Sequence, residues 1–304
     1  MIKKLLFAIS LILFAAVILY AGPSVLLDAL ISADPLPLAV ATFLIAVTIG
    51  LNGIRFHILT SSIGELPFKQ TFNVLLFSQL ANQGAIALLG DATKAVLFKK
   101  LFGHSFTRII GIVTVERGQD LLVALTCAVL LAAELSWAGY AAFGVMAVFC
   151  ALMIFVFTPP SWIRKLPFKR LSDAAQNFRE GVRAITLKTI LQSFAVTLAA
   201  LITGGLANQL LLASFGVSLP LLTVVTVTSV SLLAGLASGL PAGLGAREAS
   251  LVLMYGSFGV PASAVLMSAL LLRVIFASLS YAGYLATRTE GQNNTYKTGH
   301  TNSS

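Results

Sequence analysis

Long apolar stretches separated by short polar segments run along most of the chain. Six of these stretches are roughly 18 to 24 residues long, which is the length at which an apolar helix crosses the hydrocarbon core of a bilayer. They cover residues 5–22, 38–58, 109–132, 137–158, 189–212 and 263–286. The pattern predicts an all-α, polytopic membrane protein with about six full spans.

Two further regions, 70–101 and 220–258, are apolar but interrupted by glycine, proline and polar residues. The first lies between Lys69 and the pair Lys99-Lys100, so a single crossing would leave one basic group on the far side of the membrane. Entry and exit on the same side avoids this, and non-helical backbone at that depth must be buried in protein or line a wet cavity. We therefore expect two re-entrant or broken helical hairpins. A full crossing by 70–88 followed by a short second span stays open.

The basic residues outside the membrane regions are distributed unevenly. Loops 23–36, 133–136 and 213–219 contain no Lys or Arg, whereas Arg55, Lys99-Lys100 and the basic segment 161–188 fall on the other side. Cytoplasmic loops carry the excess of Lys and Arg, so we expect a cell-membrane protein with both termini in the cytoplasm. The net charge of +9 then reflects orientation and contact with anionic lipid, and no nucleic acid partner is expected. Residues 1–288 form a single membrane domain in this interpretation, and the polar residues 289–304 form a disordered tail.

The two interrupted regions share a spacing pattern. Asp91 precedes Glu116 by 25 residues, and Glu248 precedes Arg273 by the same interval. A Phe-Gly pair follows the first acid of each unit, at 102–103 and at 258–259. Because the two hairpins would enter from opposite faces, the pattern indicates an inverted repeat, which is typical of secondary transporters with broken helices near the midplane.

Eight ionisable residues fall inside the predicted membrane regions, and their formal charges cancel. A charge at the bilayer centre costs about 2.5–3.5 kcal/mol on insertion scales, so these residues are expected to pair or to face water. Helical spacing of three predicts the pairs Asp91–Lys94 and Arg117–Asp120. Adjacent residues on a helix point to different faces, so Glu248 is expected to pair with Arg273 instead of its neighbour. The eight residues are Asp91, Lys94, Glu116, Arg117, Asp120, Arg247, Glu248 and Arg273.

Two interpretations of these charges stay open. They could form salt bridges that hold the helices together, or they could line a polar cavity for a lipid head group or an ion. Lys94 could instead lie at the membrane interface, near the basic end of its helix. A helix that begins after Gly245 would place Glu248 at a helix N-terminus, which favours an anion, and Arg247 could then meet a phosphate.

Sequence motifs for nucleotide binding, metal-dependent hydrolysis and nucleophilic catalysis are missing. The chain has no G-x-x-x-x-G-K-[ST], no H-E-x-x-H, no G-x-S-x-G and no C-x-x-C. We therefore expect no bound cofactor or metal and no enzyme activity. Catalysis on a lipid carrier by membrane-embedded carboxylates stays an alternative.

Three segments carry the most distinctive combination of motifs: ANQGAIALLGDATKAVLFKKLFGHS, VERGQDLL and PAGLGAREASLVLMYGSFGVPASAVLMSALLLR. Together they resemble the flippase-like integral membrane family that includes the membrane part of lysylphosphatidylglycerol synthase/flippase proteins. The resemblance covers most of residues 5–287 and implies movement of a lipid or lipid-linked glycan across the bilayer. It assigns substrate-binding or translocation roles to Asn82, Gly90, Asp91, Lys94, Glu116, Arg117, Asp120, Pro241, Gly243, Gly245, Arg247, Glu248 and Arg273.

One part of the first motif differs from the family pattern. Ala87-Leu88-Leu89 stand where a Pro and an Arg often precede the Gly-Asp pair. The larger relatives add a soluble aminoacyl-transferring domain, and these 304 residues contain no such domain, so the resemblance implies transport without synthesis. The expected partners are membrane lipids with anionic or zwitterionic head groups. Alternatives are a non-transporting membrane partner of a lipid-pathway enzyme, and assembly as a homo-oligomer.

Overall fold

The computed structural model describes residues 19, 24, 28, 31–84, 87–134, 169–238 and 243–287. These residues form helices and their connections, with no strand among them, which confirms the all-α prediction. The predicted span 137–158, the tail 289–304, Pro241 and all but Leu19 of the predicted span 5–22 lie outside the described residues. The helices are α3 Pro35–Thr60, the short 3-10 helix η1 Ser61–Ile63, α4 Phe68–Gly84, α5 Ala87–Phe102, α6 Phe106–Glu134, α8 Lys169–Arg183, α9 Leu187–Ala213, α10 Leu221–Ala237, α11 Ala246–Gly256 and α12 Ala262–Thr287.

Three described helices, α3, α9 and α12, are long and apolar enough to cross a membrane. They correspond to the predicted spans 38–58, 189–212 and 263–286. Helix α6 corresponds to the predicted span 109–132 and carries charged residues on its buried face. Large apolar side chains such as Phe43, Leu191 and Val274 are 60–66 % exposed on the outer surface. Lipid solvates such a surface and water does not, so the chain is an all-α polytopic membrane protein.

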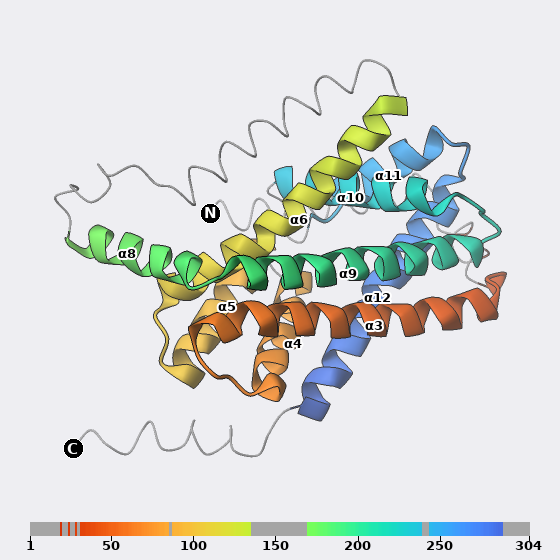
Figure 1. Cartoon of the computed structure of the whole chain (residues 1–304). Coiled ribbons are helices and arrows are strands. Elements are labelled where there is room, and N and C mark those ends of the chain that lie inside the picture. Colours follow the sequence, from red (N-terminus) through yellow and green to blue (C-terminus); the bar gives the residue numbers. More distant parts are fainter. Residues whose placement is uncertain are drawn as a thin grey trace.

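Helices α3 and α9 pack along their lengths in opposite directions (Figure 1). The backbone N–H of Asp34, directly before α3, donates to the carbonyl of Ser214, directly after α9, at 2.8 Å. The Asp34 side chain accepts from the N–H of Leu36 at 3.0 Å, and Pro35 occupies the first turn, so the start of α3 is well capped. Helices α4, α6 and α12 also contact α3, which makes it the central wall of the bundle.

The first interrupted region folds as a hairpin in which α4 packs against α5. Residues from the start of α4 and the end of α5 share one apolar cluster with the end of α3, the start of α6 and helix α8. Phe56, Val74 and Phe98 lie in this cluster and are almost fully buried. The chain therefore enters and leaves the hairpin at the same end of the bundle, which we call the basic end because Lys69, Lys99-Lys100 and α8 lie there.

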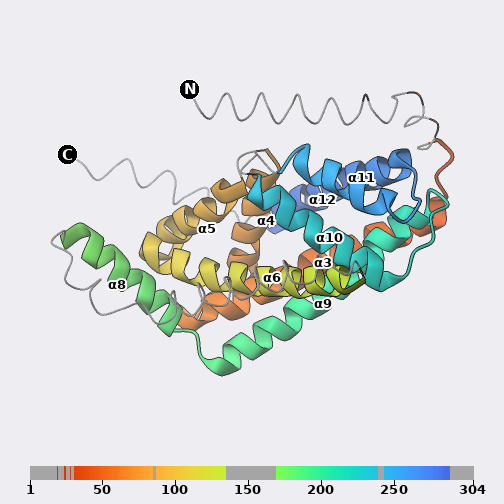
Figure 2. The same ribbon diagram turned by 90° about the horizontal axis from the view of Figure 1, so that it is seen from above.

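The second interrupted region forms a hairpin of α10 and α11 that opens at the other end of the bundle. Its apolar cluster joins the end of α9, the start of α10, the end of α11 and the start of α12, with Val224 and Tyr255 inside it. Helix α11 has 11 residues and is about 17 Å long, shorter than the hydrocarbon core of roughly 30 Å. The two hairpins thus enter the bundle from opposite ends, as the distribution of basic residues predicted (Figure 2).

The turns and long helices of the two units also correspond. The Phe-Gly pairs lie in the connections to α6 and α12, and Gly103 and Gly259 have nearly equal positive φ values of 72° and 75°. Helices α6 and α12 run in opposite directions in both views (Figures 1 and 2). Each unit is a helical hairpin, a Phe-Gly turn and a long helix, arranged in the inverted sense.

Glycines place α11 close to α10. Gly243 and Gly245 have φ values of 62° and 81°, which side-chain-bearing residues rarely adopt, and both precede the start of α11. A Cβ on Gly243 would lie 3.0 Å from the Cα of Gly235 on α10. Gly243 can make this approach because it has no side chain, and a Cβ on Gly235 would in turn lie 3.3 Å from the Cβ of Arg247.

Candidate functional site

Helices α3, α5 and α6 bring six charged side chains together inside the bundle. We call this group the six-residue cluster; it consists of Arg55, Asp91, Lys94, Glu116, Arg117 and Asp120. It holds three acids and three bases, so its formal charges cancel. Most of it is withdrawn from solvent: Arg55, Asp91, Lys94 and Glu116 are each 8 % exposed or less.

Glu116 on α6 is the most deeply placed acid of the six-residue cluster. One carboxylate oxygen accepts from Lys94 Nζ at 2.8 Å, and the other accepts from an Arg55 terminal nitrogen at 3.1 Å. The Lys94 ammonium also lies 4.9 Å from the centre of the Phe56 ring, a cation–π contact. Lys94 is 2 % exposed, so its ammonium is buried among protein groups and does not lie on the outer surface of the bundle.

Arg117 on α6 forms a bidentate ion pair with Asp91 on α5. Its Nε and one terminal nitrogen donate to the two oxygens of Asp91 at 2.7 and 2.8 Å, and the remaining terminal nitrogen donates to Asp120 at 3.2 Å. Planar two-pronged pairs of this kind are the strongest that arginine makes. The predicted pairs Asp91–Lys94 and Arg117–Asp120 are both present, at 3.6 and 3.2 Å.

The six ion pairs close into a ring in which the sign of the charge alternates. Each acid contacts two bases and each base contacts two acids. In order, the ring is Asp91, Lys94, Glu116, Arg55, Asp120, Arg117 and back to Asp91. Every member therefore keeps one partner if another member is lost.

Arg55 is the member of the six-residue cluster that the sequence interpretation missed. It had been grouped with the basic residues outside the membrane, but it is 4 % exposed and contacts Glu116, Asp120 and the hydroxyl of Thr197. The signal was present, because Arg55 falls inside the predicted span 38–58 and in helical phase with Thr48 and Asn52. With Arg55 included, the nine ionisable residues inside the predicted membrane regions number five positive and four negative, so their formal charges do not cancel.

A cavity of about 350 Å³ lies beside the six-residue cluster, and every member except Asp91 lines it. Polar groups from other helices complete the wall, among them Asn52 on α3, Asn82 on α4 and Ser229 on α10. The Arg117 side chain is 37 % exposed and is the most accessible charge of the ring. Ligand sites typically have volumes of this size, with a few polar groups placed on an apolar wall.

Asn82 and Gly90 hold the first hairpin closed beside this cavity. The Asn82 side chain accepts from the backbone N–H of Gly90 at 3.0 Å, a donor in the first turn of α5 that needs a partner. A Cβ on Gly90 would overlap the Asn82 amide. The structure thus places both residues in a direct contact between α4 and α5, and their substrate-binding or translocation roles stay predictions.

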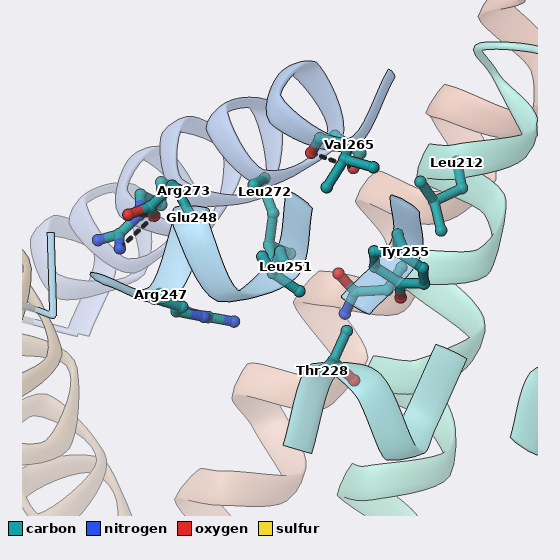
Figure 3. Close-up of a pocket in the computed structure, with 12 residues that line it drawn as sticks. Leu212, Thr228, Arg247, Glu248, Leu251, Tyr255, Val265, Leu272 and Arg273 are labelled. Atoms are coloured by element: carbon teal, nitrogen blue, oxygen red, sulfur yellow. Dashed lines mark hydrogen bonds and ion pairs between the residues drawn. The ribbon is translucent and has the colours of Figure 1, made fainter. Parts of the chain in front are cut away.

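Helices α11 and α12 form a second charged group, the three-residue cluster of Arg247, Glu248 and Arg273. Glu248 accepts from Arg273 at 2.9 and 2.6 Å through one oxygen and from the N–H of Gly245 at 2.8 Å through the other. The predicted Glu248–Arg273 pair is thus confirmed, and so is the position of Glu248 at the N-terminus of α11 (Figure 3). Glu248 is 1 % exposed, and both of its oxygens are occupied.

Arg247 points away from the Glu248–Arg273 pair (Figure 3). Its Nε is buried and has no hydrogen-bond partner, and no carboxylate of the described residues forms an ion pair with it. The neighbouring residues 239–242, which are not described, contain no acid. The three-residue cluster therefore holds two cations and one anion, an excess of one positive charge.

The two clusters open into adjoining cavities. Arg247 and Arg273 line a cavity of about 220 Å³, and they also line a smaller pocket, drawn in Figure 3, which has room for a water molecule at most. Thr48 on α3 and Phe276 on α12 line both the 220 Å³ cavity and the 350 Å³ cavity. These two residues mark the boundary between the cavities.

The structure thus sorts the predicted site residues into two groups. Asn82 and Gly90 accompany the six-residue cluster, Gly243 and Gly245 accompany the three-residue cluster, and Pro241 lies outside the described residues. No group of three or more His, Cys, Asp or Glu side chains able to hold a metal occurs in the part of the chain that the structure describes.

Comparison with known proteins agrees with this architecture. The family model described as the lysylphosphatidylglycerol synthase TM region matches residues 6–280. A UPF0104 membrane protein of Methanothermobacter thermautotrophicus is 24 % identical, over 84 % of this chain and 83 % of the relative. The family match takes in both hairpins and both charged clusters. The chain is therefore an integral membrane protein that belongs to the family of the lysylphosphatidylglycerol synthase transmembrane region.

Proposed function

We propose that this protein translocates a lipid or a lipid-linked glycan across the membrane, with the polar head group passing through the charged cavities while the acyl chains stay in the bilayer. The observation that carries the proposal is the 350 Å³ cavity lined by five members of a buried ion-pair ring. Charged residues within a membrane bundle commonly mark the path of a substrate or an ion.

The arrangement of the two hairpins supports this function. They enter from opposite ends, and their charged clusters line cavities that adjoin at Thr48 and Phe276. Inverted repeats with broken helices that meet near the midplane allow alternating access to one site from either side. Because the sequence carries no ATP-binding loop, we expect downhill or ion-coupled movement and no enzyme activity.

The basic residues at one end of the bundle support an orientation of the protein in the membrane. Lys69, Lys99-Lys100, Arg183 and Lys188 all belong to helix ends at this side. The excess of Lys and Arg marks the cytoplasmic face, so we place this end, together with both termini, in the cytoplasm of a cell membrane. The first hairpin then enters from the cytoplasm and the second from outside.

A second candidate function is a non-transporting membrane partner of a lipid-pathway enzyme. The observation that favours it is the closed ion-pair ring, because fully paired charges can hold helices together without any ligand. A partner protein would tolerate matched removal of charges, since buried ion pairs are often replaceable by apolar groups with little loss of stability.

The test is lipid movement in proteoliposomes. Purified protein is reconstituted in phosphatidylcholine vesicles with tail-labelled lipids that carry phosphoglycerol, phosphoethanolamine, phosphocholine or aminoacylated phosphoglycerol head groups. Asp120→Asn is the informative variant, because Asp120 lines the cavity and both of its partners keep another acid. We expect at least tenfold slower movement of one lipid class. Arg183→Gln, which removes an exposed charge on α8, is the control and should transport normally.

The outcome separates the two candidates. Selective movement of one class that Asp120→Asn slows supports translocation. If folded protein moves none of these lipids faster than empty vesicles do, the translocator proposal fails for them and the partner function is favoured.

A further inference from the structure

We propose that the cavity lined by Arg247 and Arg273 is a binding site for one phosphodiester group, with Arg247 as its principal ligand. This inference rests on the proposed function and names the part of the substrate that the second hairpin recognises. It starts from the unequal charge balance of the three-residue cluster.

The first step is that Arg247 has no protein partner for its charge. The only acid in the three-residue cluster is Glu248, and its two oxygens are taken by Arg273 and by the Gly245 N–H. The Arg247 Nε is buried without a hydrogen-bond partner. An unpaired cation inside a membrane protein is unfavourable, so its presence requires an anion or water from outside the chain.

The second step is that contacts between α10 and α11 hold the backbone of Arg247 in place. Gly243, at a φ of 62°, packs against Gly235, and a Cβ added to Gly235 would lie 3.3 Å from the Cβ of Arg247. The Cβ of Arg247, at the start of α11, therefore packs directly against α10. The guanidinium is left facing the cavity of about 220 Å³.

The third step concerns which anion fits. A guanidinium binds carboxylate and phosphate oxygens through a planar fork, which an ammonium does not provide. The cluster has one excess positive charge, and a phosphodiester carries one negative charge. A phosphomonoester carries about 1.5 to 2 negative charges, so one excess positive charge would neutralise it only in part. The balance therefore favours the diester that joins a lipid to its head group.

The surroundings are also suited to a group attached to acyl chains. Leu272 and Phe276 on α12 and Ile45 on α3 line the same cavity, so part of its wall is apolar and part carries the two arginines. Free inorganic phosphate would bring no apolar part to this wall. A lipid phosphodiester would place its oxygens on Arg247 and its glycerol carbons on the apolar side.

The experiment measures binding and does not depend on transport. Purified protein in a non-ionic detergent is titrated calorimetrically with dihexanoyl phosphatidylglycerol, with glycerophosphoglycerol and with inorganic phosphate. Arg247→Met and Arg247→Lys are compared with Arg183→Met, which removes an exposed guanidinium elsewhere. The short-chain lipid should bind at least tenfold more weakly to Arg247→Met, with an intermediate loss for Arg247→Lys and none for Arg183→Met.

Each result decides between named alternatives. Equal affinity of Arg247→Met and the unmodified protein for the lipid overturns the site. Tighter binding of inorganic phosphate than of the lipid overturns the phosphodiester assignment. If the lipid binds through Arg247 but proteoliposomes show no lipid movement, the binding site stands and the translocator proposal fails. If lipids move and Arg247→Met moves them normally, the translocator stands and this site fails. A melting curve for each variant confirms that it is folded.

Discussion

The two charged clusters differ in how completely their charges are paired. The six-residue cluster is a closed ring in which every acid touches two bases and every base two acids. The three-residue cluster is a single pair, Glu248 with Arg273, next to an arginine without an acid. The first arrangement is redundant, and its formal charges cancel. The second is neither redundant nor neutral, which is why we assign ligand recognition to it.

The same difference suggests a division of labour between the halves of the repeat. A neutral ring with an accessible Arg117 can exchange partners without exposing a net charge, which suits a path that a head group passes along. A cluster with one excess cation holds an anion until something displaces it. The predictions below test this contrast, beginning with the largest expected effect.

Glu248→Ala should destabilise the protein more than any other single change discussed here. It leaves Arg273 without its acid beside an already unpaired Arg247, and it removes the acceptor for the Gly245 N–H. Breaking a buried pair on one side costs about 3–5 kcal/mol. The check is the free energy of unfolding in mixed detergent micelles.

The control for this variant is the double change Glu248→Gln with Arg273→Met, which removes both charges of the pair. It should recover most of the stability that Glu248→Ala loses, because no charge of the pair stays behind. A double variant as unstable as the single one would mean that packing at α11, and not the ion pair, sets the loss.

Glu116→Gln should have a smaller effect, although Glu116 is as deeply buried as Glu248. Arg55 keeps Asp120 and Lys94 keeps Asp91, so neither base is left alone. We expect a loss of about 2 kcal/mol, within the range for an impaired buried charged hydrogen bond. The same unfolding measurement checks it, and a loss equal to that of Glu248→Ala would contradict the redundancy of the ring.

Much of this fold was predictable because the bilayer restricts the choices. Spans 38–58, 109–132, 189–212 and 263–286 all correspond to helices, since apolar length alone determines where helices can cross. The first hairpin was predictable from Lys69 and Lys99-Lys100, which cannot lie on opposite faces without breaking the charge rule, and the second from the loop 213–219, which has no Lys or Arg. The packing of α3 along α9 was not predictable from the sequence. Apolar residues face lipid and neighbouring helices alike, so they do not indicate which helix packs against which.

The candidate site was predictable where local spacing determines contact. The Arg117–Asp120 pair followed from helical phase, whereas for Glu248 the sequence excluded only its neighbour Arg247, and Arg273 was the expected partner among the remaining bases. Arg55 was missed because a charge near the end of a span looks the same in sequence whether it reaches the interface or turns inward. The closed ring joins α3 to residues more than 60 positions away, and no local pattern encodes that distance.

The glycine contacts offer a test of how the second cluster is positioned. Gly243→Ala should cost about 1–2 kcal/mol, because the residue has positive φ and its Cβ would press on the Gly235 backbone. It should also weaken phosphodiester binding by displacing Arg247. Gly90→Ala is the matched change in the first hairpin. It displaces the Asn82 amide, leaves Arg247 in place, and should leave calorimetric binding unchanged.

Arg247→Met should have the smallest effect on stability, and it tests the comparison most directly. Methionine fills a similar space, no carboxylate loses an ion-pair partner, and a cation whose Nε is buried without a partner is removed, so the unfolding free energy should stay within about 0.5 kcal/mol or rise. The measurement is the melting temperature in detergent without added lipid. A fall as large as that of Glu248→Ala would show that Arg247 has a protein partner, and the contrast between the clusters would then disappear. Unchanged stability together with lost phosphodiester binding would mean that the arginine is kept for a ligand, because the fold alone gains nothing from it.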